Sequence, residues 1–116
     1  MKIGILGGTG PAGSALAARL ADVGYDVIIG SRSADRAKEK VDELLAKWPD
    51  RTLAIEAGDN AAAAGADVVV IATPWDGATQ TAASVREQLG HKVVISMANA
   101  LTRIGKEFQP LVPPRG

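Results

Sequence analysis

The sequence has 116 residues, 47% of them hydrophobic, and its 13 basic and 13 acidic side chains give a formal net charge of zero. This length predicts one domain with a buried core, and the balanced charge disfavours a nucleic-acid partner held by a general basic field. The absence of cysteine and the single histidine exclude disulfide scaffolds and thiolate or multi-histidine metal sites, and no signal-peptide pattern or bilayer-length apolar stretch is present, so we expect a cytoplasmic protein without a membrane partner.

Short apolar runs alternate with helical patterns along most of the chain. In chain order they predict strand 2–6, helix 13–23, strand 26–30, helix 34–48, weaker strand 52–57, short helix 60–65, strand 67–72, helix 76–89 and strand 92–96. From Met97 onward the sequence predicts no regular element, and its last prolines favour an extended or loop ending. Alternating strands and helices with short connections predict an α/β fold, a Rossmann-type doubly wound parallel sheet of about five strands with helices on both faces.

Individual residues support these boundaries. Gly24 follows the first predicted helix, where a left-handed cap favours glycine. Ser33 is suited to cap the next helix, and Asp35 would lie favourably in its first turn. The continuous β-branched run at 68–71 is typical of a central parallel strand that is covered on both faces. Trp48 is expected to anchor the end of its helix in the core.

Residues 8–13 read Gly-Thr-Gly-Pro-Ala-Gly and fit the pattern G-x-G-x-x-G. The pattern follows a predicted strand and opens a predicted helix, which is the context in which it indicates dinucleotide binding. Gly8 would permit the tight turn, Gly10 would let a pyrophosphate approach the backbone, and Gly13 would let the helix pack close to the strand. The alternative is a glycine-rich turn that binds nothing.

The start of the predicted helix adds groups suited to phosphate. A helix N-terminus offers unpaired N–H groups and a partial positive charge. Thr9 adds a hydroxyl donor, and Pro11 costs little there because its missing N–H would have no partner within the helix. We therefore expect the pyrophosphate to bind at this loop.

The end of the second predicted strand reads Gly-Ser-Arg, without the acidic residue that usually accepts from the ribose hydroxyls of NAD. Ser31 could donate to a 2′-phosphate, and Arg32 could bind the same phosphate with two N–H groups. Arg36 lies one helical turn further on, so it could face this phosphate too. Two charge-assisted bonds would give a preference on the order of 10² to 10⁴ for NADP(H). The alternative is that both arginines are solvated, but cations near a helix start are unfavourable without an anion nearby.

Three segments together resemble the NADPH:coenzyme F420 oxidoreductase family: Ile-Leu-Gly-Gly-Thr-Gly at 5–10, Ile-Gly-Ser-Arg at 29–32 and Thr-Pro-Trp at 73–75. The resemblance covers essentially the whole chain as the family's N-terminal domain. It implies hydride transfer between NADP(H) and coenzyme F420 as co-substrate, without a catalytic side chain or a metal. It implies NADP contacts from Thr9, Gly10, Pro11, Ala12, Ser31, Arg32 and Arg36, with the nicotinamide end near Ala72, Thr73, Pro74, Ala98 and Asn99.

The resemblance also implies a continuation of the natural protein beyond Gly116. In this family the C-terminal part completes the deazaflavin site and typically forms a homodimer, so residues 1–116 would be the NADP-binding domain. Two alternatives stay open at the level of sequence. One is an NADP-dependent reductase with another acceptor, such as an imine or a ferric complex. The other is a non-enzymatic NADP-binding module.

Overall fold

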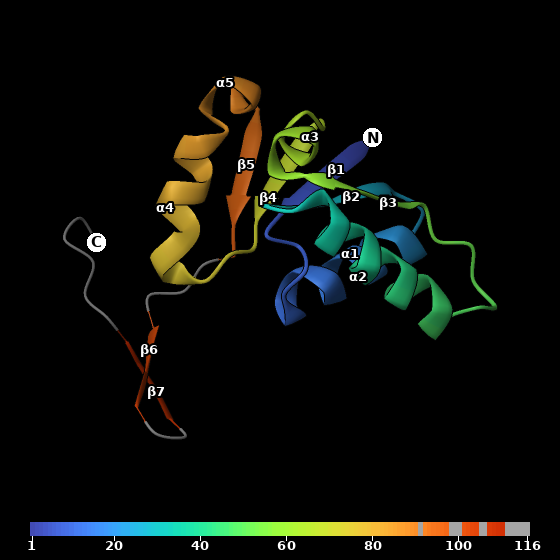
Figure 1. Ribbon diagram of the computed structural model, residues 1–116, viewed down its shortest axis with the longest axis horizontal. Helices are drawn as coiled ribbons and strands as arrows, with labels where there is room; N and C mark the ends of the chain where they lie inside the picture. The colour runs from blue at the N-terminus through green and yellow to red at the C-terminus, as the bar shows by residue number, and fades with distance from the viewer. Residues whose placement is uncertain (91, 98–100, 105–106, 111–116) are drawn as a thin grey trace.

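Five parallel strands form the central sheet of the computed structural model, which describes residues 1–90, 92–97, 101–104 and 107–110 (Figure 1). The strands are β1 (Lys2–Leu6), β2 (Asp26–Ser31), β3 (Ile55–Asp59), β4 (Val68–Ile71) and β5 (Val93–Ser96). Their order in the sheet is β3-β2-β1-β4-β5. The chain therefore reverses direction across the sheet between β1 and β4, and the predicted Rossmann-type topology is confirmed.

Helices cover both faces of this sheet. They are α1 (Pro11–Asp22), α2 (Ala34–Lys47), α3 (Asn60–Ala64), α4 (Trp75–Ser84) and α5 (Arg86–Leu89). Alternate strand residues point to opposite faces. Ile5 and Ile29 pack on the face that α1 and α2 cover, whereas Leu6 and Ile28 pack on the face that α3 covers together with α4 and α5. The two hydrophobic layers confirm the doubly wound arrangement.

Three of the predicted boundary residues have the expected roles. Gly24 follows α1 with a φ of +103°, in the left-handed region that favours glycine. The Ser33 hydroxyl accepts a hydrogen bond from the backbone N–H of Arg36 and so caps α2, with Asp35 in the first turn. Trp48 is partly buried against the core at the end of α2, as predicted.

A small helix lies unusually close to the sheet. On β1 a Cβ atom at Gly4 would stand 1.8 Å from the Ala63 carbonyl oxygen, and on β2 one at Gly30 would stand 2.7 Å from the Ala63 Cβ. On β3 a Cβ at Gly58 would stand 3.0 Å from the Ala62 Cβ. One glycine on each of three adjacent strands thus makes room for α3, which brings its first residue against the carboxyl end of β1.

Two sequence predictions for the second half of the chain are wrong. The single helix predicted at 76–89 is divided into α4 and α5 at Val85, whose side chain is buried in the core and whose φ of −121° leaves the helical region. An antiparallel hairpin, β6 (Leu101–Ile104) and β7 (Glu107–Pro110), occupies a region where no regular element is predicted. Its strands of four residues are stabilised by pairing with each other, which the periodicity of either segment alone does not reveal.

Figure 1 shows β6 and β7 as a ribbon separate from the five-stranded sheet. No helix in the described part of the chain combines the length and the apolar character that crossing a membrane requires.

Candidate nucleotide-binding site

The loop after β1 is held where the ends of three strands meet. The backbone N–H of Gly8 donates to the carbonyl of Gly30 at 2.9 Å, which fastens the loop to the end of β2. The N–H of Ala72 donates to the carbonyl of Leu6 at 2.9 Å, which brings the segment after β4 to the same edge. This is the carboxyl edge of the sheet at the point where the strand order reverses, the usual place for ligands in doubly wound folds.

The three glycines of the loop pattern differ in what surrounds them. A Cβ at Gly8 would stand 2.9 Å from Ile29 Cγ2, and one at Gly13 would stand 2.8 Å from the Gly8 Cα, so both positions are closed by the protein itself. At Gly10 the nearest atom would be the Gly7 carbonyl oxygen at 3.8 Å. The protein therefore leaves space beside Gly10, although the neighbouring glycines are tightly packed.

The N-terminus of α1 opens onto this space with its donors unpaired. Gly10 is the N-cap and has no side chain to accept from the helix, and the first turn contains no acidic residue. Within residues 1–90, where every residue is described, no acceptor receives the backbone N–H groups of Ala12 and Gly13. The helix end thus presents free donors and the positive end of its dipole.

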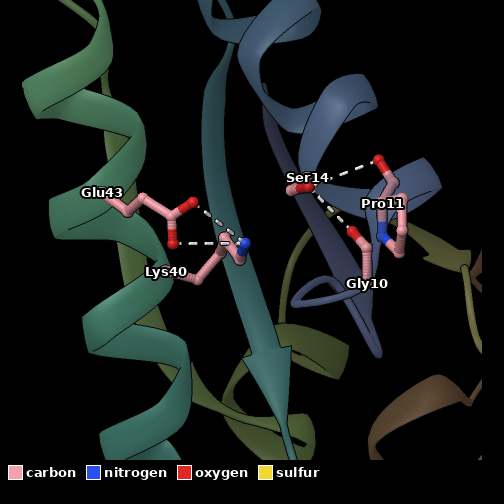
Figure 2. A network of polar contacts seen from close by, with 5 residues as sticks. All are labelled: Gly10, Pro11, Ser14, Lys40 and Glu43. Carbon is pink, nitrogen blue, oxygen red and sulfur yellow. Dashed lines mark hydrogen bonds and ion pairs between the residues drawn. The ribbon is translucent and has the colours of Figure 1, made fainter.

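Ser14 strengthens the start of the same helix. Its buried hydroxyl donates to the Gly10 carbonyl at 2.8 Å and lies 3.3 Å from that of Pro11 (Figure 2). Because its proton is directed to these carbonyls, the Ser14 hydroxyl stabilises the start of the helix and is not a free donor for a ligand.

The end of β2 carries the predicted serine and arginines. Ser31 is 8% exposed, and its hydroxyl oxygen accepts from the N–H of Ser33 at 3.3 Å, which leaves its proton available as a donor. Arg32 and Arg36 are exposed, and neither guanidinium forms an ion pair within the described part of the chain. Lys40, one turn beyond Arg36, contacts the Glu43 carboxylate at 3.4 Å (Figure 2). Arg32 and Arg36 are therefore cations without an ion-pair partner in the described part of the chain, and both follow the end of β2.

Residues after β4 form the other wall of the loop. Thr73 packs its methyl group on the glycine turn, since a Cβ at Gly7 would stand 2.5 Å from Thr73 Cγ2. The Thr73 hydroxyl is buried and has no hydrogen-bond partner within the part of the chain that the structure describes. Pro74 is exposed and is the N-cap of α4. Ala98 and Asn99, predicted near the nicotinamide, lie outside the described residues.

Asn60 belongs to this site, although the sequence pattern assigns it only to a helix start. Its side-chain oxygen accepts from the backbone N–H of Gly7 at 3.2 Å, and the residue is 9% exposed. No local pattern distinguishes this asparagine from a capping residue, because its partner lies 53 positions earlier in the chain. Asp59 before it is the true cap of α3 and accepts from the N–H of Ala62 at 2.8 Å.

The arrangement suits a dinucleotide better than a metal ion. Free N–H donors and unpaired guanidinium groups favour an anion with more than one phosphate. Among the described residues, no group of three or more histidine, aspartate or glutamate side chains is placed to hold a metal ion.

Comparison with known proteins gives consistent matches. The family described as NADP oxidoreductase, coenzyme F420-dependent, matches residues 2–100. An F420-dependent NADP reductase of Methanothermobacter thermautotrophicus is 43% identical over 96 residues, which is 82% of this chain and 41% of that protein. The enzyme of the same name from Methanocaldococcus jannaschii is 39% identical over 121 residues, 100% of this chain and 54% of that protein.

Solved structures agree with the sequence matches. A candidate F420-dependent NADP-reductase from Arthrobacter sp. FB24 superposes with a TM-score of 0.75 at 29% identity, covering 95% of this chain and 50% of that one. Synechocystis arogenate dehydrogenase shares the fold, with a TM-score of 0.68 at 24% identity over 91% of this chain and 36% of that one. This chain spans about half the length of its curated relatives, 41% to 54% of each. The match over residues 2–100 shows that the chain belongs to the family of coenzyme F420-dependent NADP oxidoreductases.

Proposed function

We propose that this chain binds NADP(H) at the glycine loop and supplies the nicotinamide half of a site for hydride transfer between NADP(H) and coenzyme F420. The observation that carries the proposal is the coincidence of two features at one edge of the sheet. The free donors at the start of α1 lie beside open space at Gly10, and the hydrogen bond from Gly8 to Gly30 holds this loop next to Ser31 and its arginine neighbours.

In this proposal the pyrophosphate is bound by the backbone N–H groups of Ala12 and Gly13. Their positions at the helix end give the hydrogen bonds a favourable dipole direction. A side chain at Gly10 would occupy the space that the phosphates need, whereas the glycine leaves the backbone accessible. Thr9 supplies a hydroxyl from the same loop.

The 2′-phosphate of NADP is bound by Ser31, Arg32 and Arg36. The serine proton is free to donate, and each guanidinium is free to form bidentate bonds. The residues at the end of β2, Gly30, Ser31 and Arg32, include no acidic side chain to accept from an unphosphorylated ribose. These contacts favour NADP(H) over NAD(H).

The nicotinamide end is proposed to lie near Ala72, Thr73 and Pro74, and near Ala98 and Asn99 beyond β5. The buried Thr73 hydroxyl supports this placement because a ligand would give it the partner that the described part of the chain does not provide. When both cofactors are bound, they supply the chemistry of hydride transfer. The chain's own residues bind and orient the nucleotide and exclude water from one face of its ring.

The second half of the site is proposed to be formed by the part of the relatives' sequences that this chain does not span. The same part is where we place the F420 contacts and a homodimer interface. Because two reacting rings must lie about 3–3.5 Å apart, a single open face does not hold the second ring in place. We therefore expect the chain of 116 residues to bind NADPH but to transfer hydride to F420 only slowly.

The test compares this chain with a chimera that adds the remaining part of the Methanocaldococcus jannaschii relative. Stopped-flow absorbance of F420 with NADPH follows the transfer, and calorimetry measures NADP⁺ binding. Binding by both proteins with rapid transfer only in the chimera is the expected result. Rapid transfer by the chain alone would contradict the divided site. A chimera that binds NADPH without reducing F420 would indicate another hydride acceptor.

A further inference from the structure

We infer that Asn60 is the positioning residue of the glycine loop, holding the turn at Gly7 in the shape that receives the pyrophosphate. The inference rests on the NADP(H) site proposed above. Asn60 lies behind the loop and acts on the ligand only through the backbone, so it is not a catalytic residue.

The contact that carries the inference is made at the first residue of the turn. Gly7 has a φ of +67°, and its N–H donates to the Asn60 side-chain oxygen at 3.2 Å. The carbonyl of Gly7 in turn accepts from the N–H of Gly10 at 3.4 Å. Asn60 is therefore linked to Gly10 through the two hydrogen bonds of Gly7, one at its N–H and one at its carbonyl. Gly10 is the residue beside which the phosphates are proposed to bind.

The asparagine is itself fixed by its surroundings. A Cβ at Gly30 would stand 3.1 Å from its side-chain oxygen, so the amide rests directly on the end of β2. The close contacts of Ala63 with Gly4 and Gly30 hold α3 on the sheet. Because the Asn60 oxygen is buried and α3 is fixed on the sheet, the N–H of Gly7 keeps one orientation even when no ligand is bound. A site whose geometry exists before binding is preorganised.

The amide also suits this position chemically. Its oxygen is a strong acceptor without charge, whereas a carboxylate here would carry a negative charge toward the site of the phosphates. Thr73 closes the opposite side of the turn with its methyl group. Gly7 is thus held by a hydrogen bond on one side and by a packing contact on the other.

The test replaces Asn60 by alanine and measures dissociation constants for three ligands by calorimetry. NADP⁺ and NAD⁺ should each bind about tenfold more weakly, because the buried N–H of Gly7 loses its acceptor and the loop loses its shape. Adenosine 2′-monophosphate, which has no pyrophosphate, should change by less than about twofold. The ratio of NADP⁺ to NAD⁺ affinity should stay constant, which a change at the arginines would not allow.

Asp59→Ala is the matched control. It removes the cap of the same helix and leaves the bond to Gly7 in place. We expect a lower melting temperature and no weakening of NADP⁺ or NAD⁺ binding. Equal weakening by Asp59→Ala and Asn60→Ala would overturn the inference, since stability of α3 would then be the cause.

Asn60→Asp decides the question if the alanine variant does not fold. It keeps an acceptor for Gly7, so the melting temperature should be retained, but its charge should weaken both dinucleotides by an amount that shrinks as salt is added. Unchanged dinucleotide affinity in this variant, or in a folded Asn60→Ala, would overturn the inference. Failure of the unaltered chain to bind NADP⁺ would instead contradict the proposed function.

Discussion

At the scale of single residues, glycines with the same place in a sequence pattern have different physical roles. Gly8 and Gly13 are required by the packing of the protein, since a Cβ at either would approach another atom within 3.0 Å. Gly10 meets no such restriction. In the proposed function, this free space lets the phosphates approach the backbone.

Gly10→Val should therefore separate binding from folding. The side chain enters open space, so the melting temperature should change by no more than a few degrees, whereas both NADP⁺ and NAD⁺ should lose measurable binding. Thermal unfolding and calorimetry on the same sample give the two quantities. Gly13→Val is the contrasting variant and should destabilise the fold, because its Cβ would meet the Gly8 Cα at 2.8 Å. A folded Gly10→Val that binds NADP⁺ normally would rule out this loop as the phosphate site.

Arg32→Ala should weaken NADP⁺ by about tenfold or more and leave NAD⁺ nearly unchanged. The expected loss is that of one charge-assisted hydrogen bond to the 2′-phosphate. Lys38→Ala is a suitable control, because it removes an exposed cation from the same helix. Parallel loss of NADP⁺ affinity in both variants would mean that only the general charge of α2 matters.

Thr73→Val keeps the shape of the side chain and removes a buried hydroxyl that has no partner within the described residues. We expect the ligand-free protein to keep its stability or gain up to about 1 kcal/mol, since an unsatisfied polar atom is lost. NADP⁺ should bind about five- to tenfold more weakly if the hydroxyl donates to the nucleotide. Loss of stability with unaltered binding would show a structural role instead.

The roles of Ser31, Arg32 and Arg36 remain predictions of the sequence that await these measurements, whereas Asn60 and Thr73 illustrate what local sequence does not reveal. The glycine loop can be recognised in the sequence because its residues are consecutive and follow an apolar strand. Asn60 contacts Gly7 across 53 positions, and Thr73 contacts the same turn from the end of β4. Both contacts depend on the strand order, which periodicity alone does not determine.

At the scale of elements, short apolar runs predicted the central strands because β1, β2 and β4 are buried on both faces, and apolar residues at helical spacing predicted the helices that cover them. These patterns failed where tertiary contacts decide the boundary. Val85 is buried in the core at the point where α4 ends and α5 begins. The β6–β7 hairpin depends on pairing between its two strands. The close approach of α3 to the sheet was also unpredicted, since it needs three glycines far apart in the chain.

Gly4→Ala tests that close approach. The new Cβ would stand 1.8 Å from the Ala63 carbonyl oxygen, so α3 must move away and the fold should lose about 3 kcal/mol. Chemical denaturation measures the loss. Gly77→Ala, in the first turn of α4, is the matched change, because its Cβ would have no neighbour closer than 3.9 Å, and it should stabilise the fold by up to about 1 kcal/mol. Equal stability of the two variants would contradict the packing described for α3.

At the scale of the whole molecule, the two edges of the sheet differ. Ile55 on the edge strand β3 is 7% exposed, whereas Val93, Val94 and Ile95 on the edge strand β5 are 62%, 40% and 51% exposed. The residues proposed to bind the phosphates lie away from this edge, at the ends of β1 and β2. Phosphate binding is therefore not proposed to depend on the exposed edge strand, which is why nucleotide binding is expected of this chain by itself.

The affinities for NADP⁺ and NAD⁺ test the central claim most directly, because binding of either nucleotide requires the glycine loop and the ratio of the two affinities reports on the contacts to the 2′-phosphate. Calorimetric titration of the 116-residue chain with each nucleotide, at one fixed salt concentration, gives the two dissociation constants. We predict that NADP⁺ binds on the order of 10² to 10⁴ times more tightly, the contribution of two charge-assisted contacts to the 2′-phosphate. Equal affinities, or tighter binding of NAD⁺, would contradict the account.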